Sequence, residues 1–235
     1  MPYDTAVTES QIKTPVNVEK LKYRLSMKRA TPNPPQLVEG NVTIANNQLE
    51  WWERDGGVKF LKKIGLRYGQ RVLDFGCRVG HYTIPAAKVV GDKGIVLAVD
   101  KEMQALNELE QKATANDLKN IKILKTSGQT TLDLERESIE VVLLYDVLHY
   151  FEKSYRKKLY KEAFRLLKQD GLLSVYPKHT LEDWPIQEFA SLSLSDVKHE
   201  IEASNFIFEH RFCGLISHDD GLNQGCVLNF RKCEK

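Results

Sequence analysis

Short apolar runs and longer amphipathic segments alternate along most of the chain. Continuous apolar runs of this length predict buried strands. They are found at 71–76, 94–100, 121–127, 139–146 and 171–178. Between them, apolar residues recur at helical spacing. These helical segments are 81–90, 101–117, 153–168 and 193–204, and Ser195 or the serine before it is expected to cap the last of them.

The C-terminal part of the chain breaks this alternation. Two apolar runs, 206–217 and 226–233, flank the polar segment "HDDGLNQG" with no helix between them. The pattern predicts two strands joined by a turn-rich loop. Together the runs predict an α/β fold with a Rossmann-like, doubly wound, seven-stranded sheet. This sheet is mostly parallel and ends in an antiparallel C-terminal strand pair.

Residues 1–55 differ from the rest of the chain in their pattern of apolar and turn-forming residues. "ATPNPPQLVEGN" is rich in turn residues, and the segment 46–66 is expected to be helical up to Asp55, to break at Gly56-Gly57 and to resume after it. We therefore predict an N-terminal extension, strap or cap over the pocket at 1–55 and the main domain at 56–235. Trp51 and Trp52 could supply apolar walls to a pocket, and packing onto the domain is the competing interpretation.

Composition narrows the protein class only slightly. The 235 residues are 42% hydrophobic and 28% charged, which is typical of a globular chain, and the net charge of +2 is too small to indicate nucleic-acid binding. No apolar run is long enough to span a bilayer, and the first residues lack the apolar core of a signal peptide. We therefore expect a cytoplasmic protein. Its four cysteines are expected to be reduced and buried, and no metal site is expected.

The turn "VLDFGCRVGHYT", residues 72–83, carries the candidate chemistry. Gly76 and Gly80 would let the backbone approach a ligand where the first strand passes into a helix. Asp100 ends the second strand, where a carboxylate can accept both hydroxyls of a ribose. Asp74 would repel a pyrophosphate and attract an ammonium group, which favours S-adenosylmethionine over a dinucleotide. A capping role for Asp74 is the plainer alternative.

These residues resemble the start of a class I S-adenosylmethionine-dependent methyltransferase of the small-molecule type, which has a "VLDxGCGxG" turn. "IEVVLLYDVLHYF", "EAFRLLKQDGLLSVYPK" and "SNFIFEHRF…CVLNFRK" resemble later elements of that family, so the resemblance covers roughly residues 65–233. It implies binding of S-adenosylmethionine, release of S-adenosylhomocysteine and a small-molecule acceptor of unnamed identity. It implies no membrane partner and leaves the oligomeric state open.

The resemblance also implies roles for individual residues. Asp74 would face the methionine amino group, and Asp100 would hold the ribose. The further cofactor-binding residues would be Gly76, Cys77, Gly80, Lys101, Ser127, Gly128 and Tyr145. Ser127 replaces an aspartate that is common in the family at the adenine edge. Arg78 stands where the family usually has glycine, so it would be strained if the turn needs a positive φ.

Residues that could act on the acceptor are weaker candidates. Asp146, His149 and Tyr150 follow the fourth strand, yet a turn cap, a packing residue and a core aromatic are the favoured interpretations of them. His179 is a weaker candidate still, and the remaining late histidines, His199, His210 and His218, are expected in loops or facing solvent. Alternatives to the methyltransferase are a nicotinamide-dependent dehydrogenase, a non-catalytic binding protein on the same fold, suggested by Arg78, and an RNA methyltransferase.

Overall fold

The computed structural model describes residues 47–180, 192–219 and 221–233, which belong to a compact unit spanning Val42–Lys235. Most of the sequence-predicted segment 1–55 lies outside the described residues, and its role as a cap stays a prediction. None of the helices in the described ranges has the length and apolar character needed to cross a bilayer.

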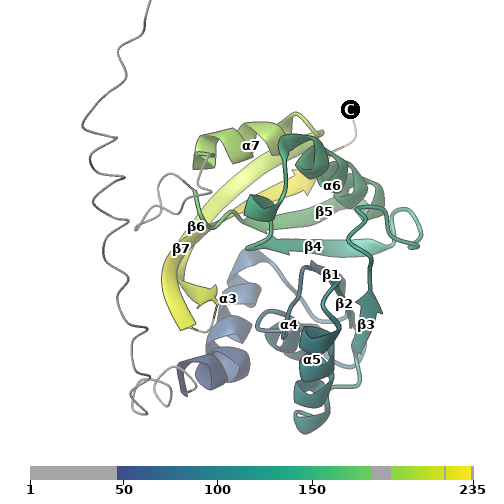
Figure 1. The fold of residues 1–235 in the computed structure, drawn as a ribbon, viewed down its shortest axis with the longest axis vertical. Helices are drawn as coiled ribbons and strands as arrows, with labels where there is room; N and C mark the ends of the chain where they lie inside the picture. The colour runs from purple at the N-terminus through teal and green to yellow at the C-terminus, as the bar shows by residue number, and fades with distance from the viewer. Residues whose placement is uncertain (1–46, 181–191, 220, 234–235) are drawn as a thin grey trace, which may run out of the picture. The chain divides into compact units, whose positions relative to one another are not determined.

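A single seven-stranded sheet runs through this unit in the order β3-β2-β1-β4-β5-β7-β6 (Figure 1). β1 lies in the middle and pairs in parallel with β2 on one side and β4 on the other. The strands are β1 (Arg71–Phe75), β2 (Ile95–Asp100), β3 (Ile121–Lys125), β4 (Ile139–Tyr145), β5 (Leu167–Tyr176), β6 (Phe206–His218) and β7 (Gly221–Lys232). β7 pairs antiparallel with both β5 and β6. The predicted fold class is confirmed.

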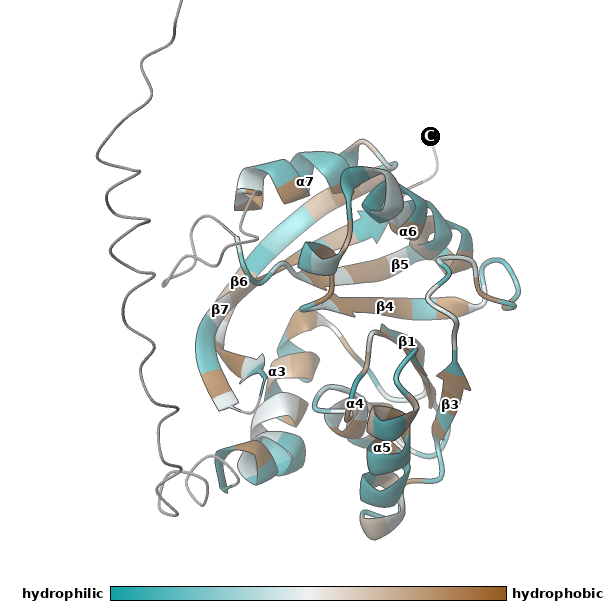
Figure 2. Cartoon of the chain, in the orientation of Figure 1, coloured by the Kyte–Doolittle hydropathy of each residue, from teal (hydrophilic) through white to brown (hydrophobic). Residues whose placement is uncertain are grey.

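Helices cover both faces of the sheet. Successive strand residues point to opposite faces, and the residues on each face are apolar and pack against helices. Leu73 and Leu97 pack into the apolar cluster on one face, whereas Val72 and Val96 pack into the cluster on the other. In Figure 1, α6 (Lys153–Leu166) and α7 (Leu194–Glu202) lie on one side of the sheet, and α3 (Gly57–Ile64), α4 (Thr83–Val90) and α5 (Met103–Ala115) lie on the other. Strand β4 is apolar along most of its length, as expected for a strand covered on both faces (Figure 2).

The expected break at Gly56-Gly57 is wrong. Residues 47–51 are helical, a π-helical stretch follows at Trp52–Gly56, and α3 continues directly from Gly57. Both glycines keep right-handed helical φ angles, −62° and −64°. A Cβ at Gly56 would lie 2.4 Å from the ring of Trp51, and one at Gly57 would lie 2.9 Å from Pro85. The glycines therefore make room for neighbouring rings and do not end the helix.

Trp52 belongs to the core of the domain. Its side chain is buried against Phe60 and Tyr82, and its indole Nε1 donates a hydrogen bond to the carbonyl of His81 at 2.9 Å. Packing onto the domain, the competing interpretation of the sequence, is therefore the one that the structure supports for this residue. Trp51 is 41% exposed.

The predicted loop at 218–225 is also wrong, because β6 extends through His218 and β7 starts at Gly221. Residues at both ends of the segment "HDDGLNQG" are paired in the β6–β7 hairpin, and His218 lies opposite Gly221. The same register places Cys213 opposite Cys226, and the two form a disulfide. The expectation of four reduced cysteines is thus wrong for this pair, while Cys77 is free and buried as expected.

Candidate functional site

A cavity of about 520 Å³ opens at the carboxyl ends of β1, β2, β3 and β4. In an open α/β sheet this is where ligands bind, next to the point at which strand order reverses, here between β1 and β4. The volume falls within the range of small-molecule sites, roughly 300–1,000 Å³. Six of the nine predicted cofactor-binding residues line it: Gly76, Asp100, Lys101, Ser127, Gly128 and Tyr145.

Asp100 is held rigidly at the end of β2. Its Oδ2 accepts a hydrogen bond from the backbone N–H of Arg78 at 2.9 Å, and its Oδ1 accepts one from the N–H of Glu102 at 2.9 Å. The residue is buried yet borders the cavity. Each carboxylate oxygen keeps a further lone pair, so Asp100 can still accept the two hydroxyls of a ribose.

The other three predicted cofactor residues lie behind the cavity wall. Asp74 is buried and accepts a hydrogen bond from Thr83 Oγ1 at 2.6 Å. Burial raises the pKa of Asp74 to about 6, although the hydrogen bond from Thr83 works in the opposite direction. Cys77 packs in an apolar cluster beneath α5, where burial raises its pKa and keeps it a thiol. Neither these two nor Gly80 lines the cavity, and their predicted contacts with the methionine portion stay predictions.

Arg78 has the positive φ that the sequence raised as a possibility, 44°. Its guanidinium extends toward Asp219, with Nη1 3.5 Å from Oδ1, and both side chains are mostly exposed. Arg78 therefore lines the cavity, and its guanidinium lies next to Asp219. The hydrogen bond to Asp100 comes from the backbone N–H, which every residue type except proline supplies.

Two glycines show how closely a ligand could approach. At Gly76 φ is 80°, and a Cβ there would lie 2.3 Å from Val147 Cγ1. At Gly128 a Cβ would meet no atom within 4 Å, although this residue borders the cavity. The hydroxyl of Tyr155 donates to the carbonyl of Gly128 and fixes the loop after β3. The space beside Gly128, where β3 ends, is thus open, and a planar or extended ligand can lie against the backbone there, whereas at Gly76 Val147 occupies the place of a Cβ.

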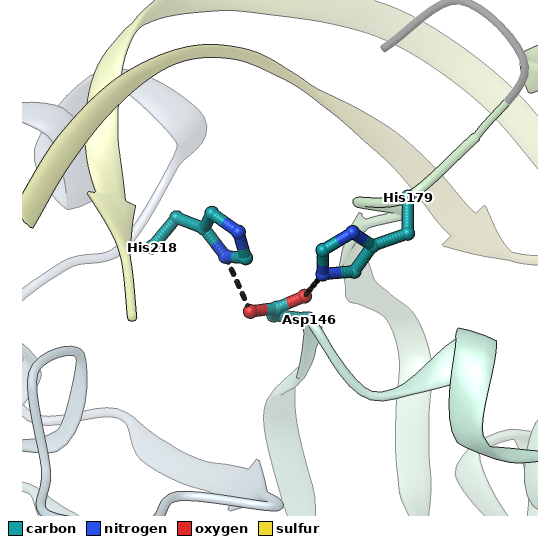
Figure 3. Close-up of side chains that lie close together, drawn as sticks. All are labelled: Asp146, His179 and His218. Atoms are coloured by element: carbon teal, nitrogen blue, oxygen red, sulfur yellow. Dashed lines mark hydrogen bonds and ion pairs between the residues drawn. The ribbon is translucent and has the colours of Figure 1, made fainter. Parts of the chain in front are cut away.

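A second set of polar side chains meets beside the cavity, around Asp146 (Figure 3). His218 Nδ1 lies 2.6 Å from Asp146 Oδ2, and His179 Nε2 lies 3.7 Å from Asp146 Oδ1. His149 Nδ1 is 3.5 Å from the same Oδ1. Asp146 itself has a φ of 56° and lines the cavity. A carboxylate with nearby imidazoles can orient a proton acceptor or bind a divalent cation.

Burial changes the properties of two of these histidines. It lowers the pKa of His149 to about 4 against an opposing effect of Asp146, and it also lowers the pKa of His179. Both imidazoles are therefore neutral at neutral pH. The interpretation of His149 as a packing residue fits its 4% exposed side chain, which does not exclude a role beside Asp146.

Two expectations for this region are wrong. Tyr150 is 73% exposed, not a core aromatic, because it lies in the short 3₁₀ helix Leu148–Tyr150 at the cavity edge. His218 does not face solvent, since only 9% of its side chain is exposed. His199 and His210 are exposed, in line with the prediction. The roles of Asp146, His149 and Tyr150 stay predictions.

The sheet order and the cavity at the strand ends are those of an α/β domain with the methyltransferase fold. An acidic side chain lies at the ribose position, and bare backbone lines the cavity. The cavity is also large enough for an adenosyl amino acid. The residues present therefore fit S-adenosylmethionine, which Asp100, Gly76 and Gly128 would hold.

Comparisons with known proteins agree with this class. A family model described as a methyltransferase domain matches residues 72–171. A demethylmenaquinone methyltransferase from Lactobacillus johnsonii is 29% identical over 147 residues, covering 63% of this chain and 57% of the relative. The aklanonic acid methyltransferase DauC from Streptomyces sp. is 32% identical over 106 residues, covering 39% and 48%. The chain thus spans about half to three fifths of these curated relatives.

A solved structure shows the same fold. The S-adenosylmethionine-dependent methyltransferase from Aquifex aeolicus superposes with a TM-score of 0.64 at 22% identity, and the match covers 81% of this chain and 98% of that one. The family model, the relatives and the shared fold all agree with the class I S-adenosylmethionine-dependent methyltransferases that the sequence resembles. The resemblance seen in the sequence is confirmed.

Proposed function

We propose that this protein transfers a methyl group from S-adenosylmethionine to a small-molecule acceptor. The observation that carries the proposal is the position of Asp100, buried and fixed by two backbone N–H groups at the edge of a cavity of about 520 Å³. The curated relatives support the acceptor class, because demethylmenaquinone and aklanonic acid are small molecules.

The residues at the strand ends would each contact a different part of S-adenosylmethionine. Asp100 would accept the ribose hydroxyls, and Ser127 and Gly128 would border the adenine. Gly76 and Tyr145 would border the methionine portion. When bound, the sulfonium supplies an electrophilic methyl group, so the protein's main task is to position the acceptor in line with it. Asp146 and Tyr150 border the same cavity and would contact the acceptor.

A proton acceptor is needed only if the acceptor atom begins protonated, as a hydroxyl does. Asp146, His149 and Tyr150 are the residues that the sequence offers for this step. Asp146 Oδ2 lies 2.6 Å from Nδ1 of His218, so this carboxylate orients an imidazole next to the cavity.

Calorimetric titration with S-adenosylhomocysteine tests the cofactor site. We expect one equivalent to bind, and Asp100→Asn to weaken binding at least ~10-fold, because one ribose hydrogen bond to a charged acceptor is worth about 1.5–3 kcal/mol. Asp133→Asn is the matched control, since Asp133 is exposed in the segment between β3 and β4. A thermal melt of each variant shows that the protein is folded.

The result also separates the competing functions. A folded protein that binds neither adenosyl ligand would favour a non-catalytic binding protein. Binding of S-adenosylhomocysteine together with salt-sensitive retention of RNA would favour an RNA methyltransferase. We expect neither, and methyl transfer to demethylmenaquinone and to aklanonic acid is the first activity to assay.

A further inference from the structure

Three of the chain's six histidines meet at one carboxylate, Asp146. They come from separate places: His149 from the 3₁₀ helix after β4, His179 from the segment after β5 and His218 from the end of β6. Their side chains are largely buried, between 4% and 10% exposed. The fold therefore brings these imidazoles together across the sheet, and sequence neighbourhood alone does not account for the cluster.

The distances within the cluster suit a metal ion. The ligand atoms of Asp146, His179 and His218 all lie within 4.8 Å of one another. In a tetrahedral zinc site with bonds of about 2.0–2.1 Å, two ligand atoms are about 3.3 Å apart. The separation of 3.7 Å between His179 Nε2 and Asp146 Oδ1 is close to that value. The 2.6 Å hydrogen bond to His218 is shorter, so a small rotation of its ring would accompany metal binding.

A simple carboxylate–imidazole pair is the alternative use of these residues. Such a pair needs a single imidazole next to Asp146, and His218 alone would provide it. The structure instead places a nitrogen of His179 toward the second oxygen of the same carboxylate, so that the two rings point at Asp146 from opposite sides (Figure 3). Two imidazoles and one carboxylate are a common ligand set for Zn²⁺ and Fe²⁺.

We propose that Asp146, His179 and His218 form a binding site for one divalent transition metal ion. Only Asp146 of the three lines the large cavity, so the ion would lie at the inner wall of this cavity. His149, whose ring centroid is 4.4 Å from that of His179, would pack behind the ligands and hold them. A further coordination position would face the cavity and accept an oxygen or sulfur ligand.

On the proposed function, that ligand is the methyl acceptor. A hydroxyl or thiol bound to a divalent ion would lose its proton to solvent more readily. Its oxygen or sulfur would then form a bond to the methyl carbon as the bond from that carbon to the sulfonium breaks, and S-adenosylhomocysteine would leave. This step rests on methyl transfer, whereas the metal site itself does not.

Titration of the untagged chain of 235 residues with Co²⁺ or Zn²⁺ tests the site. After treatment with a chelator and buffer exchange, we expect one equivalent of either ion to bind, and Co²⁺ to give visible absorption bands of a site with nitrogen ligands. The double variant His179→Ala/His218→Ala should bind at least ~100-fold more weakly, because two of three protein ligands are lost. His199→Ala is the matched control, since His199 is exposed on α7, and it should bind like the wild type.

Two results would overturn the proposal: no ion bound at millimolar concentration, or equal binding by wild type and double variant. Calorimetry with S-adenosylhomocysteine on the same samples distinguishes the two proposals. If the wild type binds S-adenosylhomocysteine but no metal ion, only the proposed metal site is refuted. If it binds a metal ion but no S-adenosylhomocysteine, only the proposed methyltransferase function is refuted. Thermal melts without metal show whether the double variant is folded.

Discussion

The backbone N–H of Arg78 donates a hydrogen bond to Asp100 Oδ2 at 2.9 Å, although Arg78 has a φ of 44°. The glycine turn after β1 is thus tied to the strand-end carboxylate of β2 through an unfavourable backbone conformation. Left-handed φ angles cost a non-glycine residue roughly 1–2 kcal/mol. The arginine strains the turn without removing the contact on which the proposed ribose site depends.

Arg78→Gly should therefore stabilise the protein. We expect a gain of about 0.5–1 kcal/mol in the free energy of unfolding, because the relieved strain exceeds the extra flexibility of glycine in the unfolded chain. The lost pairing with Asp219 matters little, since both side chains are mostly exposed. Urea unfolding measures the change, and S-adenosylhomocysteine affinity should move less than ~3-fold because the backbone donor remains.

Arg78→Ala is the control for this variant. It removes the guanidinium but keeps a side chain at positive φ, so it should bring no gain in stability. Equal gains for alanine and glycine would show that the side chain, and not the backbone, is the source of strain. A large increase in cofactor affinity for glycine alone would contradict the view that Arg78 leaves the site intact.

Reduction of the Cys213–Cys226 disulfide should destabilise the hairpin of β6 and β7. The two cysteines are 13 residues apart, and a crosslink over such a loop is worth about 2–3 kcal/mol, mostly by restricting the unfolded chain. Urea unfolding with and without a reductant should show this loss. Cys213→Ala/Cys226→Ala should show it without a reductant, whereas Cys233→Ser should still respond to reduction. An unchanged wild-type midpoint under reduction would contradict the bond.

The sheet could be predicted from the sequence because its parallel strands are buried on both faces. Such strands are continuous apolar runs, as "IEVVLLY" in β4 shows. The capping of α7 was also predictable. The Ser193 hydroxyl oxygen accepts a hydrogen bond from the N–H of Asp196, and the Asp196 carboxylate accepts one from the N–H of Ser193. This capping box settles the choice between the two serines considered.

The residues of the proposed ribose site could also be predicted from the sequence, because the carboxyl ends of neighbouring parallel strands meet at one edge of the sheet. What the sequence could not indicate were contacts between distant segments. His218 and Asp146 are 72 residues apart, and only the register of β6 brings them together. The disulfide depends on the same register, because it sets Cys213 opposite Cys226.

The stability of the protein should depend on pH through Asp74. Burial raises its folded-state pKa to about 6, against 3.8 for an ordinary aspartate. The folded state therefore holds a proton that the unfolded chain has lost, and the free energy of unfolding falls as pH rises from about 4 to about 6. Asp74→Asn removes this contribution and keeps an acceptor for the hydroxyl of Thr83.

Relative to wild type, the asparagine variant should become more stable as pH rises through this window. The expected size is on the order of 2 kcal/mol, because one pKa unit corresponds to about 1.4 kcal/mol. Urea unfolding between pH 4.5 and 7.5 gives the difference at each pH. Asp133→Asn, at an exposed position, is the matched control. A flat profile for Asp74→Asn would mean that this carboxyl has an ordinary pKa.

Gly76→Ala should damage the turn in two ways that can be separated. Its φ is 80°, and the new Cβ would lie 2.3 Å from Val147 Cγ1. Positive φ costs roughly 1–2 kcal/mol and the overlap a further 1–3 kcal/mol, so we expect a loss of about 3 kcal/mol in the free energy of unfolding. Gly69→Ala is the matched control, because Gly69 has a φ of 81° and no atom within 4 Å of its added Cβ. It should lose only the backbone part.

Val147→Ala tests the overlap directly, since it removes the Cγ1 atom and leaves Cβ at 3.5 Å, an ordinary contact. In that background Gly76→Ala should cost about as much as Gly69→Ala costs in the wild type. The double-mutant cycle would then give a coupling of at least ~1 kcal/mol between residues 76 and 147. A coupling near zero would mean that the cavity wall at the end of β1 moves aside without cost. Bare backbone at Gly76 would then have to be explained by the ligand rather than by packing.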